Sequence, residues 1–298
     1  MPTWMNKRQV GAFTLMGYSV AGEESVVAVP ELNVCFDAGR APREIIPIDN
    51  LCITHGHMDH AAGVAYYLSQ RGFIGAGQGR IIIHRDQAAN IQRLMAVWAD
   101  IEGHPAPGYI EGVLPGQDVK IRRDLLIRAF AVEHKASALG FAAVEARHKL
   151  KPEHHGKTGP QLVALKKQGI EIDAWIEVPL VAYCGDTAPG RFLDLPSVSD
   201  AQILLIECTF FDREHLMRAR QGLHIHVSDL RNILSRVRSE HVVLTHVTRR
   251  TDIREAQRIV QEAIDSRDRE RVSFLMDRPP RKPAEIKPEH EVSQNPKR

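Results

Sequence analysis

A short stretch of the sequence holds four side chains of the kinds that bind metal ions. Residues 53–63 read I-T-H-G-H-M-D-H-A-A-G, which places His55, His57, Asp59 and His60 within six positions. Residues two apart in an extended loop point to the same side, so His55 and His57 can bind one ion together. Asp59 and His60 follow at the next turn and point to a second position nearby. Imidazole with one carboxylate and no thiolate suits Zn²⁺, and a pair of metal ions commonly hydrolyses phosphate esters or amides.

A two-metal site needs about seven protein ligands, so others must come from elsewhere in the chain. Three candidates follow apolar runs that predict strands: His134 after L-L-I-R-A-F-A-V-E, Asp186 after V-A-Y-C-G, and His246 after V-V-L-T. Gly185 would allow a close approach beside Asp186. Taken singly, each candidate could equally cap a strand or lie on the surface. Together with the histidine-rich loop they complete the number of ligands that two metals require.

The elements that must position these residues follow from apolar runs that alternate with helical patterns. Short runs rich in β-branched residues predict strands at 12–17, 25–29, 32–37, 51–54, 80–84, 125–132, 139–147, 179–184, 203–207, 242–245 and 272–276. Amphipathic patterns predict helices at 62–71, 86–100, 228–238 and 252–266, with Ser228 and Asp252 as N-caps. Helices spread among strands indicate sheets covered by helices, in an α/β or α+β layered architecture.

Composition limits the classes of protein to which the chain can belong. Its 298 residues are 43% hydrophobic and 26% charged, and the net charge is only +2, so any nucleic-acid surface must be local. The four cysteines form no C-x-x-C pair and predict buried reduced thiols: Cys35, Cys52, Cys184 and Cys208. The sequence shows no signal-peptide core and no apolar run near the roughly 20 residues that cross a membrane. We therefore expect a cytoplasmic protein.

Two segments differ from the body of the chain. Residues 147–169 hold six Lys and Arg against one Glu, and predict a basic insertion with a turn at 156–160. Residues 279–298 are rich in proline and charge, and predict a disordered tail behind a body of residues 1–278.

These motifs resemble the metallo-β-lactamase superfamily and, within it, ribonuclease Z, the tRNA 3′-end endonuclease, in its plant-type short form. The superfamily pattern is T-H-G-H-M-D-H at 54–60, followed by His134, G-D-T at 185–187 and L-T-H at 244–246. The resemblance extends over residues 16–276. It includes F-D-A-G at 36–39, H-K-A-S-A-L-G-F at 134–141, K-L-K-P-E-H-H-G at 149–156, I-E-C-T-F at 206–210, H-I-H-V-S at 224–228 and L-T-H-V-T-R-R at 244–250. The sequence departs from the family at Phe141 and Thr251, where tyrosine is usual.

The resemblance implies a four-layer αββα sandwich of two mixed sheets between helices, and a homodimer. It also implies two Zn²⁺ per chain, with Mn²⁺ or Fe as alternatives. One metal would be held by His55, His57 and His134, and the other by Asp59, His60 and His246. Asp186 would bridge them.

The resemblance also assigns the steps of catalysis. A metal-bound hydroxide would attack the phosphate, with Asp59 orienting the water. His226 would protonate the leaving oxygen, held in orientation by Glu207, since a carboxylate fixes an imidazole tautomer and raises its pKa. His224 has the opposite strand-like parity, and we expect it to be structural.

The basic insertion occupies the place of the family's tRNA-binding arm. Backbone phosphates of precursor tRNA would meet the lysines of this segment: Lys149, Lys151, Lys157, Lys166 and Lys167. A solvated surface loop is the alternative. Few aromatic residues accompany the lysines, so we expect backbone recognition rather than base stacking.

The sequence therefore predicts a zinc-dependent phosphodiesterase that removes the 3′ trailer of precursor tRNA. The main alternative is a dizinc phosphodiesterase, or another hydrolase of this fold, with a small-molecule substrate, because fold and metal ligands do not determine the substrate. β-Lactam hydrolysis is disfavoured because it needs no Glu207/His226 pair. An RNA-binding protein without catalysis is disfavoured because it needs no complete ligand set.

Overall fold

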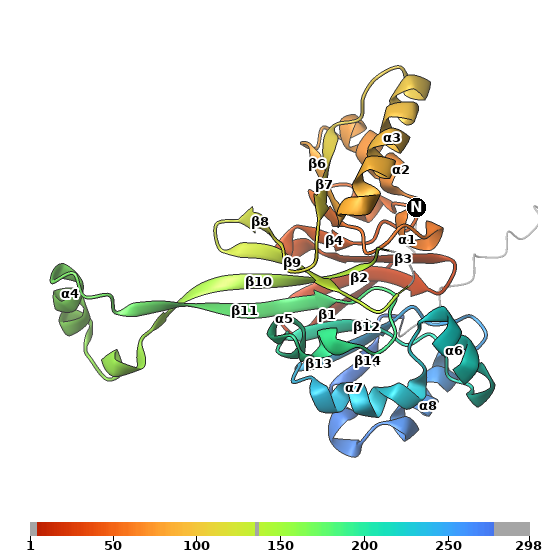
Figure 1. The fold of residues 1–298 in the computed structure, drawn as a ribbon. Helices are drawn as coiled ribbons and strands as arrows, with labels where there is room; N and C mark the ends of the chain where they lie inside the picture. The colour runs from red at the N-terminus through yellow and green to blue at the C-terminus, as the bar shows by residue number, and fades with distance from the viewer. Residues whose placement is uncertain (1–4, 135–136, 277–298) are drawn as a thin grey trace, which may run out of the picture.

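The computed structural model describes residues 5–134 and 137–276. In these residues, two seven-stranded mixed β-sheets pack face to face, and helices cover both outer faces (Figure 1). The layers run helix, sheet, sheet, helix, which confirms the predicted αββα architecture. The predicted disordered tail, 279–298, lies outside the described residues.

The first sheet is built from the N-terminal part of the chain, with its strands side by side in chain order. These strands are β1 (Asn6–Val10), β2 (Phe13–Val20), β3 (Glu24–Val29), β4 (Val34–Phe36), β5 (Asn50–Cys52), β6 (Gly79–His84) and β7 (Gly108–Val113). Pairing is antiparallel from β1 to β4 and parallel from β4 to β7. The outer face is covered by α1 (Met58–Ala61), α2 (Val64–Phe73) and α3 (Arg85–Glu102).

The second sheet has the order β14-β13-β12-β11-β10-β9-β8. Its strands are β8 (Asp118–Arg122), β9 (Leu125–Ala131), β10 (Leu139–Leu150), β11 (Asp173–Tyr183), β12 (Ile203–Glu207), β13 (His241–Thr245) and β14 (Val272–Phe274). Pairing is antiparallel from β8 to β11 and parallel from β11 to β14. Its helices are α5 (Pro196–Ser199), α6 (Leu216–Gly222), α7 (Leu230–Arg236) and α8 (Ile253–Ala263). Short 3₁₀ helices lie at Pro30–Leu32, Arg43–Ile45, Pro152–His154, Arg191–Asp194, Arg213–His215, Val227–Asp229 and Ser266–Asp268.

The central core lies between the two sheets. Both contribute buried side chains to it, such as Val27 and Phe36 from the first and Phe141 and Val181 from the second. Phe141, one of the two departures from the family pattern, thus serves as a core residue. Separate apolar clusters join each sheet to its own helices. None of the described helices has the length and apolar character to cross a lipid bilayer.

Each predicted strand and helix has a counterpart in the structure, with shifted ends. The sequence did not predict β1, β7, β8, α1, α4 (Gly159–Lys167), α5 and α6. The edge strands β1 and β8 are half exposed and polar, so their patterns lack the apolar runs of inner strands. Asp252 caps α8 as predicted, because its side chain accepts from the amide of Arg254 at 2.9 Å. The N-cap prediction for Ser228 is wrong: its own amide donates to Nδ1 of His226, which caps the 3₁₀ turn Val227–Asp229.

An arm projects from the second sheet, and we define it as residues 146–176. There β10 and β11 continue beyond the body as a two-stranded ribbon with α4 at its tip (Figure 1). The amide of Thr158 donates to the side chain of Gln161 at 2.8 Å, which fixes the first turn of α4. The predicted basic insertion, 147–169, lies within this arm.

Candidate active site

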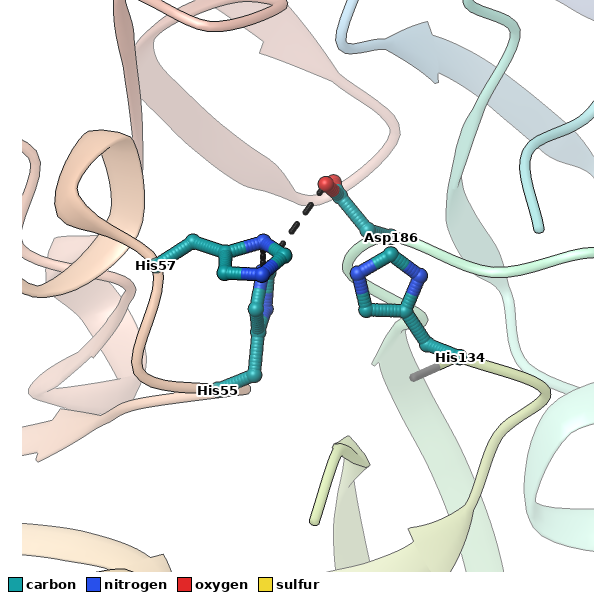
Figure 2. Close-up of side chains that lie close together, drawn as sticks. All are labelled: His55, His57, His134 and Asp186. Atoms are coloured by element: carbon teal, nitrogen blue, oxygen red, sulfur yellow. Dashed lines mark hydrogen bonds and ion pairs between the residues drawn. The ribbon is translucent and has the colours of Figure 1, made fainter. Parts of the chain in front are cut away.

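The candidate metal ligands lie at strand ends, where loops from both sheets meet. The loop after β5 and the short α1 supply His55, His57, Asp59 and His60, and the first sheet thus provides one side of the site. The second sheet provides the other side through residues that follow β9, β11 and β13: His134, Asp186 and His246. Figure 2 shows His55, His57, His134 and Asp186 turned toward one another.

The structure brings all seven predicted ligands together in two adjoining groups. Potential ligand atoms lie within 4.8 Å of one another in the group of His55, His57, His134 and Asp186, and in the group of Asp59, His60 and His246. Asp186 lies between the groups. Its Oδ1 is 3.2 Å from Nε2 of His60, and its Oδ2 is 3.3 Å from Nε2 of His246 and 3.9 Å from Nε2 of His55.

Several of these atoms lack any other function in the fold. In the described part of the chain, buried atoms without a hydrogen-bond partner include Nε2 of His60, Oδ1 of Asp186, Nε2 of His246 and both ring nitrogens of His134. Buried polar atoms are nearly always paired, because an unpaired one costs free energy. Here they converge on common positions. The nitrogen and oxygen donors therefore fit divalent cations, and the high share of imidazole suits Zn²⁺.

Backbone geometry holds the two sides of the site in close contact. Gly185 has φ +60°, and a Cβ there would lie 2.8 Å from the side chain of Thr54, which confirms the predicted close approach. Asp37 and His246 also have left-handed backbone, with φ of +57° and +55°. Such conformations are uncommon outside glycine and concentrate at functional sites.

Asp37 organises the first-sheet side of the site, a role that sequence analysis did not predict. Its buried carboxylate accepts from the amide of Thr54 at 2.8 Å, the hydroxyl of Thr54 at 2.9 Å, Nδ1 of His60 at 2.7 Å and the hydroxyl of Tyr183 at 3.0 Å. Because Nδ1 of His60 carries the proton given to Asp37, Nε2 is left as the ligand atom. Thr209 lies similarly behind His246, with Oγ1 at 2.9 Å from Nδ1.

The electrostatics of the cluster differ from one candidate ligand to the next. Burial, with the neighbouring His60, lowers the pKa of His55 to about 2, and burial also lowers the pKa of His134. For Asp59, burial acts to raise the pKa, but the hydrogen bond and charge of His246 outweigh it and hold the pKa well below its usual range. For His60, burial opposes the charge, but the carboxylates of Asp186 and Asp37 outweigh it and raise its pKa well above the usual range. His55 and His134 are thus neutral and Asp59 is ionised, as metal binding requires, whereas His60 must release a proton when it binds a metal.

Glu207 orients a histidine beside the cluster, and that histidine is His224. Oε1 of Glu207 lies 2.8 Å from Nδ1 of His224 and also accepts from the amide of Thr187 at 2.8 Å, while Oε2 accepts from the hydroxyl of Thr209 at 2.6 Å. Burial opposes charge on His224, but the Glu207 carboxylate outweighs it and raises the pKa of His224 to about 9. The His224 ring stacks on that of His246, with centroids 5.4 Å apart.

The prediction that Glu207 holds His226 is wrong. His226 is buried away from the cluster, with Nδ1 at 2.8 Å from the hydroxyl of Ser228 and Nε2 at 3.0 Å from the carbonyl of Asp212. Strand-like alternation did not apply, because Leu223 has φ +59° and turns the chain just before His224. In the sequence, the spacing from His226 to Ser228 is a capping pattern. That signal could have shown which of the two histidines, His224 or His226, has the structural role.

The site opens into a cavity of about 460 Å³ lined by residues of the cluster and by His224. Asp59 lines it too, and its Oδ2 accepts from the amide of Gly22 at 3.0 Å. Two further lining residues are cationic: Arg249, which pairs with Glu23, and Arg250. A cluster of metal-binding side chains, a histidine oriented by a carboxylate and nearby cations suit the hydrolysis of an anionic ester.

Comparison with known proteins agrees with this geometry. The Beta-lactamase superfamily domain matches residues 28–247. The chain is 30% identical to "tRNase Z TRZ1" of Arabidopsis thaliana over 84% of this chain and 90% of the relative. It is 31% identical to "tRNase Z TRZ2, chloroplastic" of the same plant over 85% of this chain and 72% of the relative. The chain belongs to the tRNase Z family of the metallo-β-lactamase superfamily. It is therefore a metal-dependent hydrolase.

A solved structure shares the fold of this tRNase Z family member. Human tRNase Z, short form, superposes with a TM-score of 0.57 at 15% identity, over 78% of this chain and 92% of the human one. At that identity, the likeness concerns the arrangement of the layers alone.

The arm of this tRNase Z family member is less basic than its sequence predicted. Lys151 pairs with Glu171 at 3.2 Å, and Lys166 pairs with Asp173 at 3.0 Å. Both acidic residues lie after the predicted insertion and approach the lysines through the hairpin. Among the described residues, three of the predicted RNA-binding lysines form no ion pair: Lys149, Lys157 and Lys167.

The cysteines play no part in the site. All four are free and buried, as predicted, and burial raises the pKa of each thiol. None belongs to a candidate metal group among the described residues.

Proposed function

We propose that this protein is a zinc-dependent endoribonuclease that cleaves the 3′ trailer from precursor tRNA. The observation that carries the proposal is the Glu207–His224 pair beside the seven-residue cluster, with Nδ1 of His224 at 2.8 Å from Oε1 of Glu207. A hydrolase of activated small esters has no need of an oriented proton donor. The names of the Arabidopsis relatives support tRNA as the substrate.

Two metal ions would be held by residues from both sheets. His55, His57 and His134 would hold one, and Asp59, His60 and His246 the other, with Asp186 between them. When bound, the ions would supply Lewis-acid stabilisation of charge on the scissile phosphate and a lowered pKa for the attacking water. Asp59, anchored through Gly22, would orient that water. Analysis of natively purified protein after zinc reconstitution should find close to two zinc ions per chain.

His224 would donate the proton that the leaving group needs. A ribose 3′-oxygen leaves poorly as an alkoxide, so a proton must reach it as the P–O bond breaks. His224 holds its Nδ1 against Glu207, which leaves Nε2–H as the donor toward the cavity. Glu207 fixes this tautomer and does not transfer the proton itself.

The test compares two histidines and two substrates. His224→Ala should slow cleavage of a 3′-extended precursor tRNA by roughly 10²–10⁴-fold, the usual worth of general acid catalysis. It should slow bis-(p-nitrophenyl) phosphate much less, because nitrophenolate leaves without a proton. His226→Asn is the matched control, since asparagine keeps a capping side chain, and it should cleave both substrates normally. Equal losses on both substrates with loss of zinc would make His224 a metal ligand. A wild-type protein that cleaves only the small ester would favour the small-molecule alternative.

The arm and one helical surface complete the proposal. Lysines of the arm would contact phosphates of the precursor tRNA, and a homodimer would place two sites in one particle. Large apolar side chains exposed on α2 and α3 support self-association: Phe73, Val97, Trp98 and Ile101. Sedimentation equilibrium should give twice the chain mass.

A cytoplasmic location belongs to the same proposal, since four reduced thiols suit a reducing compartment. Cell fractionation would test it.

A further inference from the structure

An aromatic pair lies on the arm, away from every core of the protein. Trp175 of β11 stands directly opposite His148 of β10, and their ring centroids are 3.6 Å apart at an interplanar angle of 43°. Trp175 is nevertheless 59% exposed. Tryptophan is highly buried on average, so an indole this exposed on a projecting ribbon needs an explanation.

Cross-strand packing explains only part of this arrangement. Facing aromatic side chains stabilise a two-stranded ribbon that has no sheet or helix beneath it. That role accounts for the contact between His148 and the indole. It does not require a side chain as large as tryptophan to remain mostly in solvent, since a branched aliphatic residue would pair as well.

The net charge of the arm favours an anionic partner. The arm carries six Lys and Arg against three acidic residues. Two of those acidic residues, Glu171 and Asp173, are paired with arm lysines. Lys149, next to His148 in the chain, forms no ion pair with any described residue. Alternation along β10 places Lys149 on the face of the ribbon opposite the pair, so the unpaired cations belong to the arm as a whole. Exposed aromatic rings on an arm that also carries unpaired lysines are a combination by which proteins hold single-stranded nucleic acid: stacking for the base and cations for the phosphate.

We propose that Trp175, backed by His148, stacks on an unpaired nucleobase of the RNA substrate. The inference rests on the proposed function and adds a base contact to the phosphate contacts of the arm. The base must be unpaired or flipped out, because bases inside a duplex cannot present a face to a side chain. Stacking of this kind tolerates any base, so the contact adds affinity without reading sequence.

Fluorescence gives a direct test, since the chain has only three tryptophans. A Trp4→Phe/Trp98→Phe variant leaves Trp175 as the sole indole. Titration with precursor tRNA should quench its emission, whereas a protein contact would change emission with protein concentration and without RNA. Unchanged emission at saturating RNA would overturn the proposal, and so would a change that depends on protein concentration alone.

Binding measurements give a second, independent readout. Trp175→Leu keeps an apolar side chain opposite His148 and should raise the Kd for precursor tRNA by about 5-fold to 150-fold. The slope of log Kd against log salt should stay unchanged, because no cation is lost, whereas Lys149→Gln should lower that slope by about one. Val163→Ala removes an exposed apolar side chain from α4 and is the matched control. Wild-type affinity in Trp175→Leu would overturn the inference.

The two hypotheses fail in different ways. RNA that quenches Trp175 but is not cleaved would refute the proposed activity and leave the stacking site standing. Cleavage with unchanged Trp175 emission would refute the stacking site alone. A wild-type protein that binds no RNA would refute both.

Discussion

The hydroxyl of Tyr183 forms a buried polar link between the two sheets, and its removal should weaken metal binding. Tyr183 ends β11 in the second sheet, and it donates to Asp37, the residue after β4 in the first, at 3.0 Å. Asp37 in turn holds Nδ1 of His60. Tyr183→Phe deletes only the oxygen, because the ring keeps its stacking on Phe36 at 5.2 Å.

The expected magnitudes follow from the burial of this link. A buried hydrogen bond to a charged group contributes about 1.5–3 kcal/mol. Asp37 keeps its three other hydrogen bonds, so the stability of the metal-free protein should fall toward the lower end of that range. Residues that orient a metal ligand typically change metal affinity by about 10–100-fold when substituted. The affinity that falls should be that of the metal site to which His60 belongs.

The assay is a competition with a chromophoric chelator that resolves the two metal affinities. Tyr67→Phe is the matched control. Tyr67 is also a fully buried tyrosine, but its hydroxyl donates to the carbonyl of Ile48 at 2.5 Å rather than to a residue that holds a ligand. Both variants should lose stability, and only Tyr183→Phe should lose metal affinity. The reasoning fails if the two variants bind metal equally well, or if Tyr183→Phe binds as tightly as the wild type.

Three further outcomes test other parts of the structure. Removing the metals with a chelator should lower the melting temperature, since a ligand present at 1,000 times its Kd stabilises the native state by about 4 kcal/mol; calorimetry showing no shift would mean that the cluster does not bind metal. Lys149→Gln/Lys157→Gln/Lys167→Gln should weaken binding of precursor tRNA and flatten its salt dependence, while hydrolysis of bis-(p-nitrophenyl) phosphate should fall little; equal losses would make the arm structural. Burial raises the pKa of all four thiols. A disulfide reagent at pH 8 should therefore label the native protein slowly and the unfolded protein at once. Rapid labelling of the native protein would contradict the burial of the thiols.

The metal cluster was predictable because each of its members follows a strand. Apolar runs predict strands well, and a polar residue just beyond one marks a strand end. The residues behind the ligands gave no such signal. Asp37 and Tyr183 are 146 positions apart in the chain, and the packing of the two sheets brings them together. Thr209 and His246 are 37 apart, and the pairing of β12 with β13 brings them together.

His224 and the arm acids were missed for local reasons. The choice between His224 and His226 depended on a single left-handed residue, Leu223, which reversed the expected parity. A glycine in the sequence would have indicated a left-handed conformation, whereas a leucine does not. Glu171 and Asp173 were overlooked because charge was counted along a continuous segment, whereas the hairpin brings these two acids back against lysines that lie earlier in the sequence.

The two strands of the arm are also both edges. Beyond the body, β10 at 147–150 pairs with β11 and with no other described strand, so one side of each strand presents backbone groups that another chain could pair with. Natural proteins discourage such pairing with charged side chains, lysine above all. Lys149 and Lys151 stand on this ribbon, and they would keep the arms of neighbouring molecules from joining into a shared sheet. Apolar replacements at these positions would therefore favour aggregation as well as weaken RNA binding.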